Sequence, residues 1–221
     1  GSSAPHGDGV AQMAFFGLFA LQHRGQEAAG IAVSDGRRAR VHKDEGLVAN
    51  VFTGDTLAPL TGYHAIGHPR DSTTGSNAVR NIQPLLVETR HGPLAVAHNA
   101  GPARNGAGPL GRAPADQAIA VRDPWGFRPL SVGRLPQGGH AIASETCALV
   151  TLGCTEISEV APGEIVSLRG AEIERHQALA PARPARCTFE FVYFSRPDSV
   201  WDGHNVHHVR PRLVEGLATE S

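Results

Sequence analysis

A turn signal near the start of the chain places the strongest constraint on the fold. Two runs in which polar and apolar residues alternate, 30–34 and 38–43, flank the pair Asp35-Gly36. An Asp-Gly pair between alternating runs is the strongest short-range indication of a β-hairpin, because both residues accept the backbone conformations of a tight turn. The pair therefore predicts two antiparallel strands.

Other parts of the chain repeat this pattern. A second hairpin is predicted where residues 164–168 and 171–176 flank Arg169-Gly170. Apolar residues at three- and four-residue steps predict a helix over 10–21, and the tail 206–219 has a helical composition in which Pro211 should kink the helix or delay its start. Further strands are predicted at 47–52, 64–67, 94–98, 118–122, 130–133, 140–144 and 188–194. Many short strands with few helices predict an α+β fold of layered antiparallel sheets, and 221 residues suit a single domain over 1–221.

The bulk properties exclude several classes of function. With a net charge of −1, the chain has no excess of basic residues that would favour nucleic-acid binding. No apolar run approaches the length of a membrane span, which is about 18 residues. The three cysteines lack a metal-type spacing. His204, His207 and His208 could share a helix face, for which we expect exposure to solvent and no bound metal. We expect a cytoplasmic protein without a metal site or cofactor.

Six segments, taken in order, resemble the N-terminal glutaminase domain of amidophosphoribosyltransferase, a class II amidotransferase. They are residues 16–31 (FGLFALQHRGQEAAGI), 67–75 (GHPRDSTTG), 97–101 (AHNAG), 122–130 (RDPWGFRPL), 143–148 (ASETCA) and 193–198 (YFSRPD). The resemblance covers nearly the whole chain. It implies a four-layer αββα sandwich of the N-terminal-nucleophile (Ntn) hydrolase type. In that family a terminal cysteine attacks the glutamine side-chain amide, with its own amino group as the base.

The resemblance assigns roles to several residues. Arg70 falls at the arginine that binds the substrate carboxylate, a task that suits a guanidinium, and Ser72 and Thr73 belong to the same loop. Asn99 matches the asparagine that holds the oxyanion, beside His98. The remaining substrate-binding candidates are Ala100, which replaces the oxyanion glycine, Gly101, and Arg24, for which structural support through a buried partner is the alternative role.

Other positions depart from the family. The sequence lacks the N-terminal Cys-Gly and the first strand, and a Gly/Pro-rich loop replaces the internal helical stretch that carries the ammonium-binding aspartate, for which Asp116 is a poor substitute. Pro69 and Asp71 replace a threonine and a tyrosine. We expect no phosphoribosyltransferase domain. We therefore expect a sandwich reduced by the first strand and an internal helical segment, and no hydrolysis of glutamine through a thiol.

Three functions remain open. The first is a repurposed enzyme of bacterial specialised metabolism, in which Asp71, His98 and Asn99 perform acid–base and oxyanion chemistry on a small carboxylate, carbonyl or amide compound. Against it, Asp71 could simply neutralise Arg70 while His98 packs in the core. The second is a non-catalytic module that binds an amino acid or a protein, and the third is an incomplete amidophosphoribosyltransferase. A shortened domain leaves faces uncovered, so we also expect a homo-oligomer or a partner protein.

Overall fold

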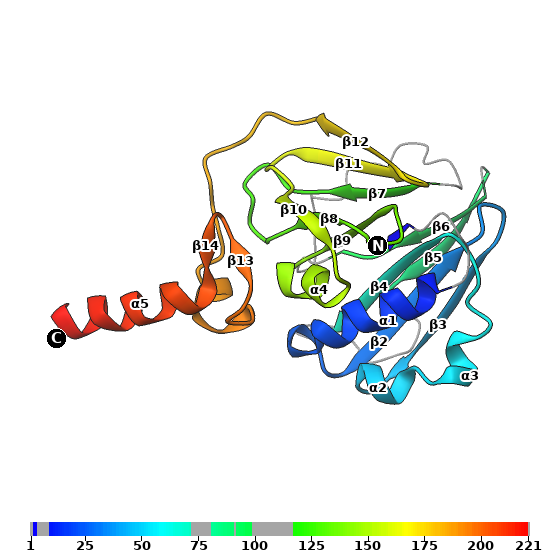
Figure 1. The fold of residues 1–221 in the computed structure, drawn as a ribbon, viewed down its shortest axis with the longest axis horizontal. Helices are drawn as coiled ribbons and strands as arrows, with labels where there is room; N and C mark the ends of the chain where they lie inside the picture. The colour runs from blue at the N-terminus through cyan, green and yellow to red at the C-terminus, as the bar shows by residue number, and fades with distance from the viewer. Residues whose placement is uncertain (1, 4–8, 72–80, 91, 99–116, 221) are drawn as a thin grey trace.

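A computed structural model of the chain describes residues 2–3, 9–71, 81–90, 92–98 and 117–220. Its largest element is a seven-stranded antiparallel sheet (Figure 1), in the order β10-β8-β9-β1-β4-β2-β3. The hairpin predicted at Asp35 is confirmed, and the Asp35 carboxylate stabilises its turn by accepting the backbone N–H groups of Arg37 and Arg38. The strands are β1 (Ser2–Ser3), β2 (Ala28–Ser34), β3 (Ala39–Glu45), β4 (His64–Arg70), β8 (Ser131–Arg134), β9 (His140–Ala143) and β10 (Thr155–Glu159).

Helices cover one face of this sheet. The predicted N-terminal helix is confirmed as α1 (Val10–Ala20), which packs beside α4 (Thr146–Thr151) over β2, β4 and β9. The strand predicted at 47–52 is wrong, because α2 (Val48–Val51) occupies this segment; α3 (Gly54–Leu57) follows it. The side chain of Gln22, in the 3₁₀ turn η1 (Gln22–Arg24), accepts the N–H of Val48 at 2.7 Å and so supports the start of α2.

A second sheet covers the opposite face. Its strands, in the order β12-β11-β7, are β7 (Ala118–Val121), β11 (Glu164–Arg169) and β12 (Glu172–Gln177), and the hairpin at Arg169-Gly170 is confirmed. Val166 and Leu168 of β11 pack with Val132 of β8 in an apolar cluster between the sheets. A separate hairpin joins β5 (Leu85–Thr89) to β6 (Gly92–Val96).

The C-terminal part extends away from this body (Figure 1). It comprises the π-helical turn η3 (Glu190–Phe194), the short strands β13 (Val200–Trp201) and β14 (His204–Asn205), and α5 (Val206–Glu220). The strand predicted at 188–194 is wrong: the N–H of Ser195 bonds the carbonyl of Glu190, and the carboxylate of Glu190 is buried in ion pairs. Tertiary contacts here override β propensity. The start of α5 is not delayed by Pro211, which lies inside the helix.

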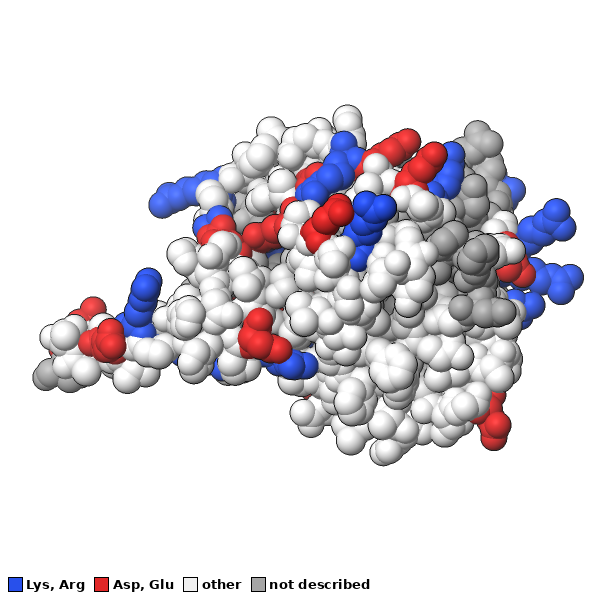
Figure 2. Space-filling model, in the orientation of Figure 1, with Lys and Arg blue, Asp and Glu red and all other residues white. Residues whose placement is uncertain are grey.

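The α+β class and its antiparallel sheets are confirmed, with one correction. The first strand is not wholly lost, because Ser2–Ser3 pair with both β4 and β9 in the middle of the large sheet. In the described residues one helical layer stacks on the seven-stranded sheet and the three-stranded sheet lies on its other face, and none of the described helices packs over β11 or β12. Charged side chains gather over β10, β11 and β12, whereas the surface over α1 and α4 is nearly free of charge (Figure 2). Among the described helices, none combines the length and apolarity needed to cross a bilayer.

Candidate functional site

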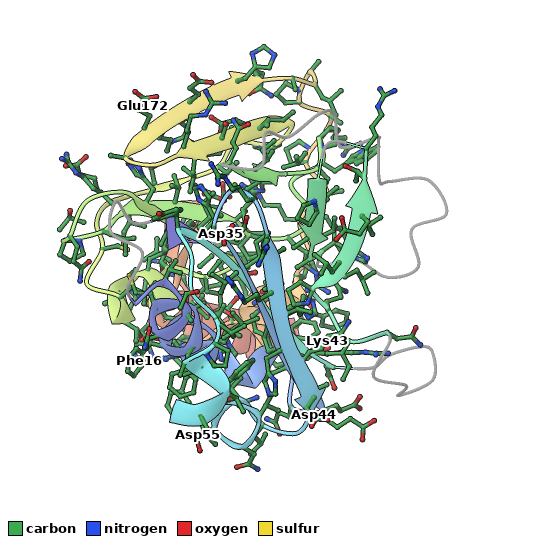
Figure 3. The ribbon with its side chains drawn as sticks, turned by 90° about the vertical axis from the view of Figure 1, so that its right-hand side faces the viewer. Phe16, Asp35, Lys43, Asp44, Asp55 and Glu172 are labelled. Carbon is green, nitrogen blue, oxygen red and sulfur yellow. The ribbon has the colours of Figure 1, made fainter. Side chains whose placement is uncertain are left out.

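The candidate site lies on the face of the large sheet turned away from α1. Ala29, Ile31 and Val33 of β2 pack into the cluster beneath α1. Because side chains alternate along a strand, Ala28 and Gly30 lie on the other face. There the register places Ala28 between Glu45 and Arg70, and Gly30 between Lys43 and His68. Small residues in the middle and long polar ones on both sides form a trough along β2, and Lys43 lies near one end of β3 (Figure 3).

Arg70 lines a small hollow at the end of this trough. Glu27, Ala28, Glu45 and Ile82 form the rest of its wall. The backbone holds Arg70 in place, since its carbonyl accepts the N–H of Glu27 at 3.1 Å as the sheet ends. The hollow therefore brings one guanidinium and two carboxylates to the same opening.

His68 is a site residue that the sequence did not single out. Burial lowers the pKa of His68 to about 4; a hydrogen bond with the backbone of His98 opposes this shift, and the charges of His98 and Arg70 add to it. Its Nδ1 atom is buried and has no hydrogen-bond partner among the described residues. His68 is thus neutral at pH 7 and places an uncharged imidazole on the strand of Arg70, hydrogen-bonded to the backbone of His98.

This lowered pKa predicts a pH-dependent stability. The unfolded chain, with a histidine pKa near 6.5, binds more protons than the folded chain between pH 6.5 and 4, so stability is full above this window and is lost as the pH falls through it. We expect the free energy of unfolding to fall by about 2 kcal/mol between pH 7.5 and pH 5 because of His68. Urea unfolding of the wild type and of His68→Gln at both pH values measures this. Equal pH slopes in the two proteins would contradict the prediction.

The structure describes three of the residues predicted for the substrate and catalytic set around Arg70. Arg70 lies at the end of β4, Asp71 follows it and is exposed, and the N–H of His98 donates to Gln83 Oε1 at 2.7 Å. A catalytic pairing of Asp71 with His98 stays a prediction. The other members lie outside the described residues; they are Ser72, Thr73, Asn99, Ala100 and Gly101.

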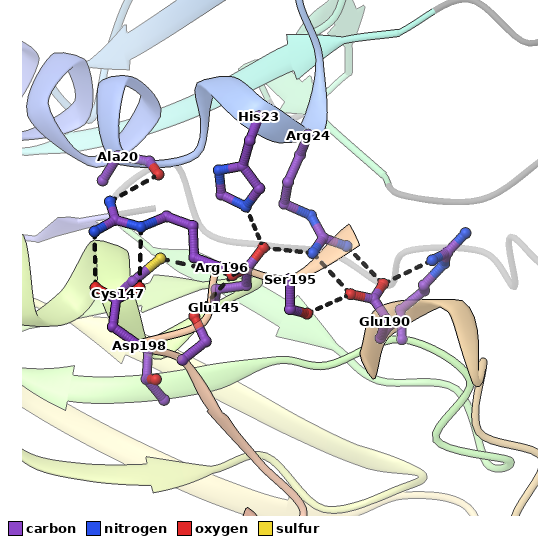
Figure 4. A network of polar contacts seen from close by, with 12 residues as sticks. Ala20, His23, Arg24, Glu145, Cys147, Glu190, Ser195, Arg196 and Asp198 are labelled. Carbon is purple, nitrogen blue, oxygen red and sulfur yellow. Dashed lines mark hydrogen bonds and ion pairs between the residues drawn. The ribbon is translucent and has the colours of Figure 1, made fainter. Parts of the chain in front are cut away.

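Arg24 lies in a separate, buried polar network (Figure 4). Its guanidinium donates to Glu145 at 2.6 Å and to both oxygens of Glu190 at 2.8 and 2.7 Å. Arg128 donates to Oε1 of Glu190 at 2.6 Å, and Nε2 of His23 contacts Oε1 of Glu145 at 2.7 Å. Two carboxylates engage Arg24, which favours the support role left open by the sequence. Substrate binding by Arg24 stays a prediction.

The network also keeps two buried carboxylates, those of Glu145 and Glu190, in their ionised form. Burial alone would raise the pKa of Glu145, but His23 and Arg24 outweigh it and hold this pKa at about 2. Burial likewise opposes the ionised form of Glu190, yet the hydrogen bonds and charge of Arg24 lower its pKa. Both carboxylates are therefore ionised at neutral pH, which a buried site tolerates only when partners surround it.

The three cysteines of the sequence lie away from the trough. Cys147 belongs to α4 and packs against Leu21 and Ala20, and Cys154 packs in the neighbouring cluster on the same face of the sheet. Burial raises the pKa of each of these two thiols to about 11. Cys187 is buried and bonded through its backbone to Phe127. A thiol with a raised pKa is a poor nucleophile at neutral pH.

Within the described residues, no group of three or more acidic, histidine or cysteine side chains is placed to hold a metal ion.

Known proteins resemble this chain over almost its full length. The amidophosphoribosyltransferase of Synechococcus elongatus is 38% identical over 267 residues, which cover 97% of this chain and 54% of that protein. That of Methanocaldococcus jannaschii is 38% identical over 96% of this chain and 58% of its own length. Glutamine phosphoribosylpyrophosphate amidotransferase from B. subtilis superposes with a TM-score of 0.83 at 31% identity, over 100% of this chain and 58% of that one. This chain is a homologue of the amidophosphoribosyltransferase glutaminase domain.

The chain is shorter than its relatives. This amidophosphoribosyltransferase homologue spans just over half the length of the curated relatives it matches. The aligned stretch of 267 residues is longer than the 221 residues of the whole chain, so the relatives hold internal residues without a counterpart here. A second solved structure, the allosteric regulatory enzyme of purine biosynthesis, gives a TM-score of 0.86 at 32% identity, over 97% of this chain and 56% of that one. No established family profile matches the chain.

Proposed function

We propose that this glutaminase-like domain binds a small compound with a carboxylate or amide group in the hollow beside Arg70, at the end of the trough on β2, without hydrolysing glutamine through a thiol. The observation that carries the proposal is the position of Arg70, which lines a hollow in a trough of small residues. A guanidinium binds a carboxylate through two parallel N–H donors and keeps its charge at any physiological pH.

The repurposed enzyme is the form of this proposal that gives the other polar residues a task. His68 is neutral and close to His98, and Asp71 is exposed beside Arg70. A carboxylate and an imidazole next to a bound carbonyl compound supply a base and an acid for cyclisation, isomerisation or cleavage by water. With Asn99 as the oxyanion donor, Asp71 and His98 are the residues we expect to act on substrate.

Calorimetric titration with L-glutamate tests the binding site. The wild type should bind this probe, and Arg70→Ala should weaken binding at least tenfold, about the effect of losing one charge-assisted hydrogen bond or more. Arg40→Ala is the matched control. Arg40 lies on β3 and donates to Thr61, and neither residue lines the hollow beside Arg70. Equal affinity in wild type and Arg70→Ala would remove the basis for the proposal.

Turnover separates the enzyme from a binding module. If Asp71 and His98 are catalytic, Asp71→Asn and His98→Gln should abolish product formation from a carboxylate substrate while the midpoint of thermal unfolding stays nearly constant. A binding module instead shows thermal stabilisation by its ligand and forms no product in any variant.

A second candidate function follows from the length of the relatives. Because 97% of this chain aligns with about half of a curated relative, the chain also suits the glutaminase-like part of a longer amidophosphoribosyltransferase of purine biosynthesis. Sequencing of the flanking DNA distinguishes the two. A Met-Cys-Gly start upstream and a pyrophosphate-binding loop downstream support the longer protein, and a stop codon directly after Ser221 excludes it.

We also propose a homo-oligomer or a partner chain, as the exposed face of α1 suggests. This helix carries no charged residue, yet Phe16 and Phe19 are 52% and 55% exposed. Helices that are apolar all round are normally covered. Gel filtration that shows a monomer without a partner would argue against this proposal.

A further inference from the structure

The two described halves of the candidate site come from strands that are not paired with each other. His68 and Arg70 belong to β4, which pairs with β2 and β1, whereas His98 follows β6, which pairs with β5. No ladder of backbone hydrogen bonds therefore sets the distance between Arg70 and His98. The hydrogen bond between His68 and the backbone of His98 is one direct link between the halves, and a second connection adds to it.

Residues 82–84 connect the two halves. Lys43 Nζ donates to the carbonyl of Ile82 at 2.6 Å and reaches that of Pro84 at 3.4 Å, which fastens this segment to β3. On the neighbouring strand β2, Gly30 leaves room for the segment, since a Cβ there would lie 2.2 Å from the carbonyl oxygen of Gln83. The segment is thus seated on the large sheet in the same row as His68.

The side chain of Gln83 completes the connection. Its Oε1 accepts the N–H of His98 at 2.7 Å, which orients the backbone where the chain leaves β6. We propose that Gln83 is a positioning residue, which holds His98 at a fixed place relative to Arg70, and that Lys43 seats the segment that carries it. This inference rests on the proposed binding function, because it deepens the same site.

Two variants separate the role of the hydrogen bond from that of side-chain volume. Gln83→Met keeps the length of the side chain and removes the acceptor, whereas Gln83→Glu keeps an acceptor oxygen. Hydrogen exchange of the His98 amide, followed by NMR, reads the bond directly and needs no ligand. Calorimetric titration with L-glutamate reads its consequence for the site.

In Gln83→Met we expect exchange of the His98 amide to accelerate about fivefold or more, roughly the effect of losing one neutral hydrogen bond. Affinity for L-glutamate should fall by a similar factor. Gln83→Glu should restore slow exchange, and Arg40→Ala should leave the exchange of His98 unchanged. Slow exchange of His98 in Gln83→Met would overturn the proposal, as would fast exchange with no change in affinity. If the exchange pattern holds but no form of the protein binds L-glutamate, the proposed ligand is wrong and the positioning of His98 by Gln83 is supported.

Discussion

Replacement of Glu190 by alanine is expected to lower the free energy of unfolding by about 3–5 kcal/mol. The carboxylate of Glu190 is fully buried and accepts from Arg24, Arg128 and Ser195. Among the described residues, its removal leaves the buried guanidinium of Arg24 with Glu145 as its remaining carboxylate partner. An ion that loses its counter-charge in the core keeps its desolvation cost and loses the attraction that offset it.

Urea unfolding of Glu190→Ala, with Arg134→Ala as the control, measures this effect. Arg134 forms an ion pair with Glu156 in which both side chains are more than half exposed, so its loss should change stability by less than about 1 kcal/mol. A loss in Glu190→Ala as small as in Arg134→Ala would mean that water reaches Arg24, and would contradict the role of this network as a core support.

Gly30→Ala should destabilise the protein by about 2–3 kcal/mol, near the upper end for added volume in a packed site. The added methyl group would collide with the backbone of Gln83, and a backbone carbonyl has no rotamer by which to move aside. The collision would also separate residues 82–84 from Lys43. We therefore expect Gly30→Ala to lower L-glutamate affinity as well as stability.

Gly216→Ala is the matched control for this substitution. Gly216 lies inside the exposed helix α5, and a Cβ there would meet nothing within 4 Å. The same change should raise stability by about 0.5–1 kcal/mol, because alanine favours helix more than glycine does. Unfolding in urea compares the two variants. Equal stability of Gly30→Ala and the wild type would show that the segment is not seated on Gly30.

Local sequence patterns predicted the parts of the fold that depend on neighbours in the chain. The hairpins at Asp35 and Arg169 and the helix α1 need only turn residues and periodic apolar residues. Failures occurred where a distant side chain decides the local structure. Gln22 supports the start of α2, and burial of Glu190 among arginines turns a β-prone segment into a helical turn.

The same distinction, between local sequence patterns and contacts of distant residues, applies to the candidate site. The resemblance placed Arg70 and His98, and alternation along β4 would have added His68, which lies two residues before Arg70 and so on the same face. Nothing in the local sequence pairs Gln83 with His98 or Lys43 with Ile82, because these contacts join segments that are remote in the chain. Such positioning contacts become visible only in three dimensions.

We propose that this chain binds its ligand in the hollow beside Arg70 and that none of its thiols attacks a ligand there. Incubation of the purified 221-residue chain with L-glutamine, followed by an enzymatic ammonia assay, tests it most directly. We predict ammonia at the level of the protein-free control, with or without prior treatment with iodoacetamide. Ammonia release well above that control, and abolished by iodoacetamide, would contradict the claim.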